Sequence, residues 1–358
     1  MNPKLLEKEK EVLIFCKFLN MNKILLFSFL FISSISFAQI VKGKVVDQNN
    51  QPLPGSNIYF DGTTIATIAD ENGNFSLNYG SKLNSILAVS FIGYQTQFIK
   101  SFDDKDLTIV LKEAANTLNE VVIRKDRFSR KQKLQLFREQ FLGQTKTGKK
   151  AVIENEDDLY FDYDEKTFTI KGYSDKPLIV NNSLLGYKIS YELVDFEVCF
   201  FKISISSSDV VKSYYAGLTR FEETNSNAKI LNQREKCYQG SQLHFFRNLV
   251  ANIWNKENFL LFKGSYQDNP NDYFTISDFN DSKKVVVTKQ KKELSLKKFV
   301  AEFNLLFNKK QQSKIIFETE TFYVDKFGNN SNLENIFFSG YMAQQKVGDM
   351  LPMNYGIK

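Results

Sequence analysis

The chain has 358 residues, of which 42% are hydrophobic and 25% are charged. This composition excludes an intrinsically disordered protein and leaves room for two ordinary domains. The formal charge of +6 is too mild to indicate a nucleic-acid-binding protein, and the 34 Phe and 16 Tyr residues favour the half-buried surfaces of β-sheets.

The first 38 residues indicate export. A short positive start at 21–23, an apolar run over 24–35 and small residues before Gln39 are typical of a secretory signal peptide. We therefore predict a signal peptide over 21–38, and we interpret residues 1–20 as a mis-annotated start. The apolar run is too short to span a bilayer, so we expect no transmembrane helix in the mature chain.

Residues 39–113 predict a seven-stranded β-sandwich, because short β-like runs recur at regular spacing with turn signals between them. The runs are Ile40–Val46, Asn57–Phe60, Thr63–Ala69, Asn74–Leu77, Ile86–Phe91, Tyr94–Ile99 and Leu107–Leu111. The acidic segment from Asp70 to Asn74 lacks the Gly and Glu spacing of a calcium loop. We expect a tight corner there, with Asp70 bonding its own backbone and Gly73 supplying a positive φ.

The same region resembles the carboxypeptidase-regulatory-like domain of Gram-negative envelope proteins. The resemblance is carried, in order, by Gly43, Val45, Asp47, Pro52-Leu53-Pro54-Gly55, Asn57, Gly62-Thr63, Thr67, Asp70, Gly73, Phe75 and Phe91-Ile92-Gly93-Tyr94. It implies a transthyretin-like sandwich and a place in the periplasm or the outer-membrane-associated envelope of a Gram-negative bacterium. A zinc peptidase needs several histidine ligands, whereas this chain has one histidine, His244. We therefore expect no carboxypeptidase activity, no metal and no other cofactor.

Residues 114–143 predict a linker followed by a basic amphipathic helix. Ser129 and Gln132 have the spacing of a capping box, and Gly143 suits the end of the helix. Cations crowd the helix start, where they oppose the helix dipole. They suggest contact with an anionic membrane surface or an acidic partner, although a solvated charged face is the simpler explanation. These cations are Arg124, Lys125, Arg127, Arg130 and Lys131.

Residues 144–358 predict a second, mixed domain that is mostly β and has one or two helices. Alternating runs occur at Leu159–Ile170, Tyr187–Leu193, Phe196–Ile205, Phe299–Phe307 and Lys314–Val324. One helix should begin after Ser241, where apolar residues follow at helical spacing. The segment from Tyr238 to Arg247 resembles one found downstream of the same sandwich in uncharacterised envelope proteins, and that resemblance implies no activity.

The candidate site residues lie in this segment. Tyr238, Ser241, His244 and Arg247 are candidates for binding, with packing and helix capping as the alternative. Ser241 and His244 also have the spacing at which a nucleophile and a base could meet on one helix face, but no acid or oxyanion hole is evident nearby.

Two cysteines remain in the predicted mature chain, Cys199 and Cys237. They could form a disulfide in an oxidising compartment, or they could be two separate thiols.

These features predict an exported, non-enzymatic envelope protein that acts as a protein–protein adaptor or scaffold. One alternative is a glycan-binding module that uses an aromatic-lined face of either β domain. A second alternative is a hydrolase that uses Ser241 and His244. We expect the partner to be an envelope protein or a surface glycan, and not a nucleic acid.

Overall fold

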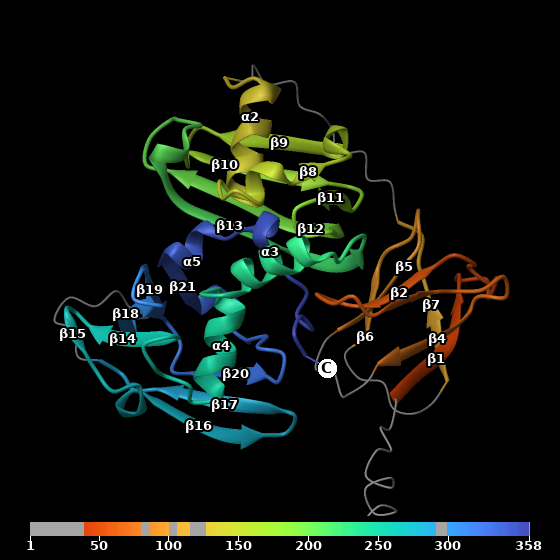
Figure 1. The fold of residues 1–358 in the computed structure, drawn as a ribbon. Coiled ribbons are helices and arrows are strands. Elements are labelled where there is room, and N and C mark those ends of the chain that lie inside the picture. Colours follow the sequence, from red (N-terminus) through yellow and green to blue (C-terminus); the bar gives the residue numbers. More distant parts are fainter. Residues whose placement is uncertain (1–38, 80–85, 100–105, 115–126, 291–298, 358) are drawn as a thin grey trace, which may run out of the picture. The chain divides into compact units, whose positions relative to one another are not determined.

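The computed structural model describes residues 39–79, 86–99, 106–114, 127–290 and 299–357 (Figure 1). The predicted signal peptide and the segment before it, with Arg124 and Lys125, lie outside the described residues. The fold is mostly β, as the sequence predicts.

Seven strands near the N-terminus form two sheets, which confirms the predicted number of strands. The first sheet has the order β4-β1-β7 and consists of β4 (Asn74–Tyr79), β1 (Gln39–Val46) and β7 (Leu107–Val110). The second has the order β3-β2-β5-β6 and consists of β3 (Ala66–Ile68), β2 (Asn57–Phe60), β5 (Leu87–Ser90) and β6 (Gln97–Ile99). Both sheets bury apolar side chains, such as Val45 of β1 and Leu87 of β5. This arrangement places the core of the sandwich between its two sheets.

The acidic turn between β3 and β4 is the predicted corner. The Asp70 carboxylate accepts the backbone N–H groups of Asn72 at 2.9 Å and Asn74 at 2.8 Å. These bonds lower the pKa of Asp70. Gly73 has a φ of 77°, and a Cβ there would lie 2.5 Å from the carbonyl oxygen of Val45. The turn therefore needs its glycine for both backbone conformation and space.

A six-stranded sheet begins the C-terminal region. It consists of β8 (Val152–Ile153), β9 (Leu159–Asp164), β10 (Thr169–Ser174), β11 (Leu178–Asn182), β12 (Tyr187–Phe200) and β13 (Val210–Glu223). Along one edge, strand β12 pairs with β11 in its first half and with β10 in its second half. Along its other edge, β12 pairs with β13. The sequence predicts two separate runs here, but a bulge near Leu193 lets one strand continue through them.

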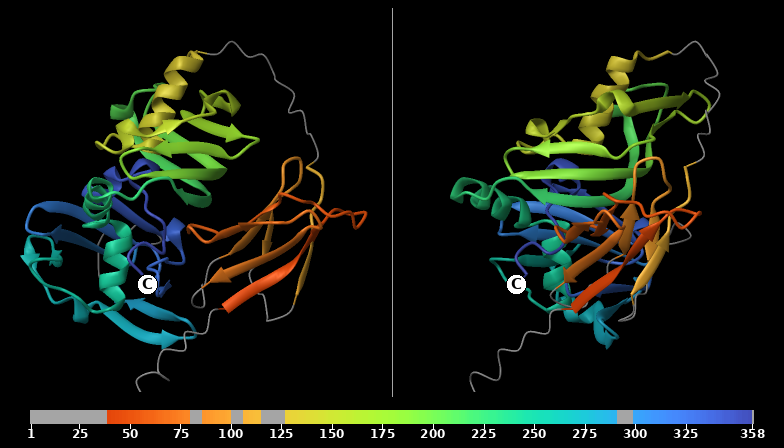
Figure 2. Two further views of the ribbon diagram at one scale, coloured as in Figure 1. Left: turned by 45° about the vertical axis from the view of Figure 1, so that its right-hand side comes forward. Right: turned by 90° about the vertical axis from the view of Figure 1, so that its right-hand side faces the viewer.

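The predicted basic helix packs on this sheet. It comprises α2 (Arg130–Phe137) and a π-helical turn, Arg138–Leu142, and the capping box of Ser129 and Gln132 is present. The ring of Phe137 lies 4.5 Å from that of Phe196. Both views in Figure 2 show α2 lying across the sheet. The aromatic stripe of the helix is therefore part of the core of this sheet.

Two further sheets and three helices complete the described chain. A five-stranded sheet consists of β15 (Tyr266–Gln267), β14 (Phe259–Lys263), β18 (Ala301–Phe307), β19 (Gln311–Phe317) and β21 (Ile336–Gly340). A three-stranded sheet consists of β16 (Phe274–Phe279), β17 (Ser282–Val287) and β20 (Thr321–Asp325). The helices are α3 (Ala228–Tyr238), α4 (Gln242–Val250) and the single turn α5 (Tyr341–Gln344). The predicted helix after Ser241 is α4, whose Phe245 and Phe246 are buried in the core of these sheets.

Candidate functional site

The four candidate residues of the α3–α4 segment lie together, where one helix ends and the next begins. Tyr238 is the last residue of α3, and Ser241 is the N-cap of α4. The Ser241 hydroxyl accepts the backbone N–H of His244 at 3.1 Å, and the His244 Nδ1 accepts the backbone N–H of Gly240 at 3.2 Å. Both side chains are thus engaged with the backbone, which argues against the hydrolase alternative.

The imidazole of His244 is packed among aromatic rings. It is 5% exposed, and its centroid lies 4.7 Å from that of Tyr238 and 5.4 Å from that of Phe307. Burial lowers the pKa of His244 to about 4. A histidine with this pKa is neutral near pH 7, so His244 contributes packing, an acceptor at Nδ1 and a side-chain hydrogen bond with Asn258.

Arg247 fastens the C-terminal segment. Its guanidinium donates to the carbonyl oxygens of Phe327 at 2.9 Å, Met353 at 2.7 Å and Tyr355 at 2.9 Å. The same group lies 5.3 Å from the centroid of the Tyr238 ring. One side chain therefore holds two segments that are far apart in the sequence.

A second arginine, Arg234, has a similar role that sequence reasoning missed. It is 2% exposed and donates to the carbonyl oxygens of Leu185 at 2.7 Å and Asn225 at 2.7 Å. It also forms an ion pair with Glu223. Its guanidinium lies 3.9 Å from the centroid of the Tyr187 ring. The burial of Arg234 is the feature that marks this role. Its position in a mostly polar helix gives no sign of that burial in the sequence.

In the structure the two cysteines are free thiols in different surroundings. Cys199 lies in β12, where its sulfur is 3.5 Å from the Thr169 hydroxyl. Cys237 is buried near the end of α3, and its sulfur is 3.8 Å from a carboxylate oxygen of Asp349. Each cysteine thus packs against its own neighbours.

Asp349 forms a buried polar cluster with Cys237 and two threonines. Its carboxylate accepts the hydroxyl of Thr145 at 2.7 Å and also that of Thr147. Burial raises the pKa of Asp349. Burial and the Asp349 charge raise the pKa of Cys237 to about 11. A thiol with so high a pKa is a poor nucleophile, so this cluster serves to hold residues 145–147 against the C-terminal segment.

Three of the five predicted cations lie in the described part of the chain, and two of these three, Arg127 and Arg130, are bonded to the protein itself. Arg127 forms an ion pair with Glu165 at 3.0 Å. Arg130 donates to the carbonyl oxygens of Leu159 at 2.6 Å and Glu156 at 2.9 Å. Lys131 is exposed. The contact with an anionic membrane surface stays a prediction. The bonds of Arg127 and Arg130 to the protein itself weaken the support for it.

The end of the β12–β13 hairpin exposes apolar side chains, Phe201 and Ile203 in the loop and Val211 at the start of β13, and we call these three residues the hairpin tip. They are 60%, 39% and 68% exposed, respectively. The loop is braced, because the Ser204 hydroxyl donates to the Asp209 carboxylate at 2.6 Å and Gln140 donates to the Ser207 hydroxyl at 3.2 Å. The sequence gives no sign of this surface, since its residues read as the end of a buried strand.

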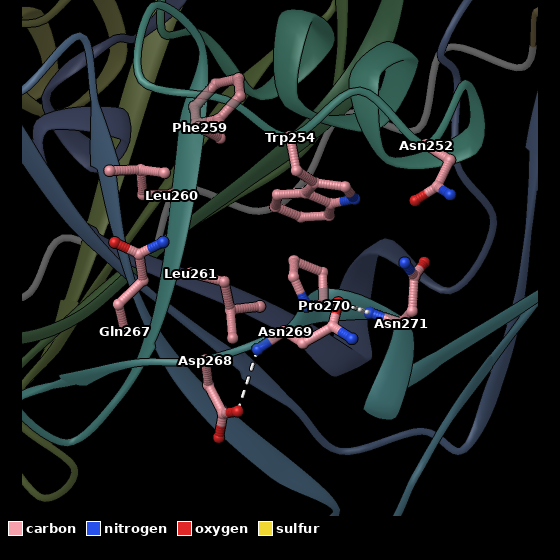
Figure 3. A pocket seen from close by; sticks show the side chains of 10 residues that line it. All are labelled: Asn252, Trp254, Phe259, Leu260, Leu261, Gln267, Asp268, Asn269, Pro270 and Asn271. Carbon is pink, nitrogen blue, oxygen red and sulfur yellow. Dashed lines mark hydrogen bonds between the residues drawn. The ribbon is translucent and has the colours of Figure 1, made fainter.

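A pocket of about 540 Å³ lies beside the end of α4 (Figure 3). Its apolar lining includes Trp254, Leu261 and Pro270, and its polar lining includes the side chains of Gln267 and Asn271. All of these residues come from one stretch of chain that runs from the end of α4 through the β14–β15 hairpin. No motif in the sequence of this stretch predicts a site.

Neither a metal site nor a membrane-spanning helix is found in the part of the chain that the structure describes. No three His, Cys, Asp or Glu residues there are grouped so that they could hold a metal ion. None of the described helices is both long enough and apolar enough to cross a membrane.

Comparison with known proteins finds similarity in the N-terminal sandwich. Residues 41–123 match the family model of the CarboxypepD_reg-like domain. The TonB-dependent receptor SusC of Bacteroides thetaiotaomicron is 39% identical over 102 residues, which are 28% of this chain and 10% of that receptor. The TonB-dependent receptor P39 of Formosa agariphila is 30% identical over 99 residues, which are 28% of this chain and 9% of that receptor. The matched stretch thus spans about a tenth of the length of each receptor.

Among solved structures, a type II cohesin–X-dockerin complex from Acetivibrio cellulolyticus is 20% identical to this chain. The similarity covers 21% of this chain and 58% of that one, with a TM-score of 0.19. A TM-score this low supports no argument about fold or function.

Proposed function

We propose that this chain, whose residues 41–123 are a CarboxypepD_reg-like domain, is an exported envelope protein that works as a non-enzymatic adaptor for another envelope protein. The predicted signal peptide over 21–38 supports export. The similarity of the sandwich to parts of TonB-dependent receptors supports a setting in the cell envelope.

The hairpin tip is the observation that carries this proposal. Burying a Phe or Val side chain is worth about 1.5–3 kcal/mol, and exposed apolar patches on a folded protein commonly mark interaction sites. The tip presents Phe201 and Val211 mostly exposed. Its loop is already ordered by the bonds of Ser204 and Ser207, so little further ordering entropy opposes binding.

We propose a non-enzymatic role because the candidate residues make structural contacts. Ser241 caps α4 and His244 accepts a backbone N–H inside an aromatic cluster. Arg247 is occupied by three carbonyl oxygens. Each of these side chains has a structural partner that a catalytic role would have to displace.

The test is in-cell crosslinking of the tagged full chain, followed by mass spectrometry of envelope fractions. Three proteins are compared: the natural chain, the double variant Phe201→Ser with Val211→Ser, and the control Val152→Ser. Val152 is 58% exposed in β8 and lies outside the hairpin tip. We expect one dominant envelope protein with the natural chain and the control, and its loss with the double variant. No partner for an exported natural chain, or equal capture by the double variant, would contradict the proposal.

A further inference from the structure

The pocket beside α4 has the size of a ligand site and is independent of the hairpin tip. Its volume of about 540 Å³ falls within the roughly 300–1,000 Å³ typical of small-molecule pockets. The pocket is formed where the end of α4 meets the turn at Pro270–Asp272 and the hairpin of β14 and β15. Three short segments thus surround one space.

Trp254 gives this pocket a fixed aromatic wall. Its indole is parallel to the ring of Phe274 within 6°, with the centroids 6.2 Å apart. It also makes an edge contact with Phe245 at 6.1 Å. Figure 3 shows Pro270 and Asn271 across the opening from the indole. Because its other neighbours hold the indole, a ligand would meet a surface that needs no reordering.

The polar lining consists mainly of amides whose hydrogen-bonding capacity is available. Within the described part of the chain, no hydrogen bond involves the side chains of Gln267 and Asn271. Both residues are exposed. Each amide offers a donor and an acceptor side by side, and that pattern matches neighbouring hydroxyl groups, which also donate and accept.

The charge of the lining excludes an anionic ligand. Among the described residues that line the pocket, none is Lys or Arg. Asp268 is the one carboxylate, and it already accepts the Tyr273 hydroxyl at 2.5 Å and the Asn269 backbone N–H at 2.9 Å. A phosphate or carboxylate would meet the charge of Asp268 and find no cation in the lining, because the nearby Lys263 lies outside it.

We propose that this pocket binds a neutral oligosaccharide. The apolar C–H face of a pyranose ring lies on the indole of Trp254, where the negative face of the ring system attracts weakly positive C–H groups. The hydroxyl groups at the ring edge bond to the amides of Gln267 and Asn271. An aromatic platform flanked by amides and free of cations fits this class of ligand better than a peptide or a nucleotide.

The chain contains a single tryptophan, so tryptophan fluorescence, excited selectively over that of tyrosine, reports on this pocket. The full chain is titrated with cellopentaose, maltopentaose and chitopentaose. Incorporation of 5-fluorotryptophan adds a second readout, one ¹⁹F resonance from position 254. The variant Gln267→Ala with Asn271→Ala keeps the reporter and removes both amides. Gln312→Ala removes an exposed amide in β19, outside the pocket, and is the control.

We expect a saturable change with at least one pentaose, with a Kd of about 0.1–1 mM. The double variant should bind about fivefold or more weakly, with unchanged urea unfolding, and the control should bind as the natural chain does. No change with any of the three sugars at ten times the upper Kd would overturn the inference. Equal binding by the double variant would overturn it as well.

Discussion

Acid should destabilise the folded chain through its one histidine. Burial lowers the pKa of His244 to about 4, whereas a histidine in an unfolded chain has a pKa of about 6.5. Between these values the unfolded state binds more protons, so this contribution to stability is present at neutral pH and is lost as the pH falls. At about pH 4.5 the loss amounts to about 2 kcal/mol relative to pH 7.

Buried carboxyl groups act in the opposite direction over the same range. Burial raises the pKa of both Asp325 and Asp349, so the folded state holds their protons more tightly and gains stability as the pH falls. The natural chain therefore reports a mixture of effects. His244→Asn separates them, because its Oδ1 oxygen can accept the Gly240 N–H that Nδ1 now accepts and it does not titrate.

The assay is urea unfolding, followed by far-UV circular dichroism, of both proteins from pH 7 to about pH 4.5. The measured quantity is the free energy of unfolding of the natural chain minus that of His244→Asn. We expect this difference to fall by about 2 kcal/mol over the range. A difference that stays constant within about 0.5 kcal/mol, or an imidazole NMR titration with a pKa near 6.5, would refute the reasoning.

Three further predictions concern the described contacts. Arg247→Lys should lower the free energy of unfolding by about 1–3 kcal/mol, because the three donors of an ammonium sit on one nitrogen and cannot reach the carbonyl oxygens that Arg247 contacts from three separate nitrogens. A loss below about 0.3 kcal/mol in urea unfolding would contradict this. Gly73→Ala should cost about 1–3 kcal/mol through backbone strain and its clash with a carbonyl of β1. Gly93→Ala, also at positive φ but with open space around it, should cost less in the same urea unfolding, and equal losses would show that the clash is unimportant. Iodoacetamide should label Cys199 well before Cys237, whose pKa burial raises to about 11; peptide mapping that finds the reverse order would contradict the assigned surroundings.

Local patterns in the sequence were sufficient to predict the sandwich and two of the helices. The alternation in strands such as β4 is visible because one face is buried and the other exposed. The N-caps at Ser129 and Ser241 are visible because a capping side chain acts within three residues of itself. Features that depend on short-range chemistry were therefore readable without the structure.

Features that depend on distant segments were not predicted. Helix α3 was missed because it is mostly polar and buries only Ile230, Arg234 and Cys237. The role of Arg247 depends on carbonyl groups some 80 to 108 residues away, and no local pattern encodes that distance. The pocket at Trp254 was missed for another reason: its lining residues are near in sequence, but only the fold shows that they enclose a space.

The adaptor role is tested most directly by photo-crosslinking from single positions in living cells. A benzoylphenylalanine residue is placed at position 201 in the hairpin tip and, in a separate protein, at position 152 in β8. Our account predicts a light-dependent product with one envelope protein from position 201 and none from position 152. Light-dependent products that are the same from both positions, or none from position 201 in an exported protein, would contradict it.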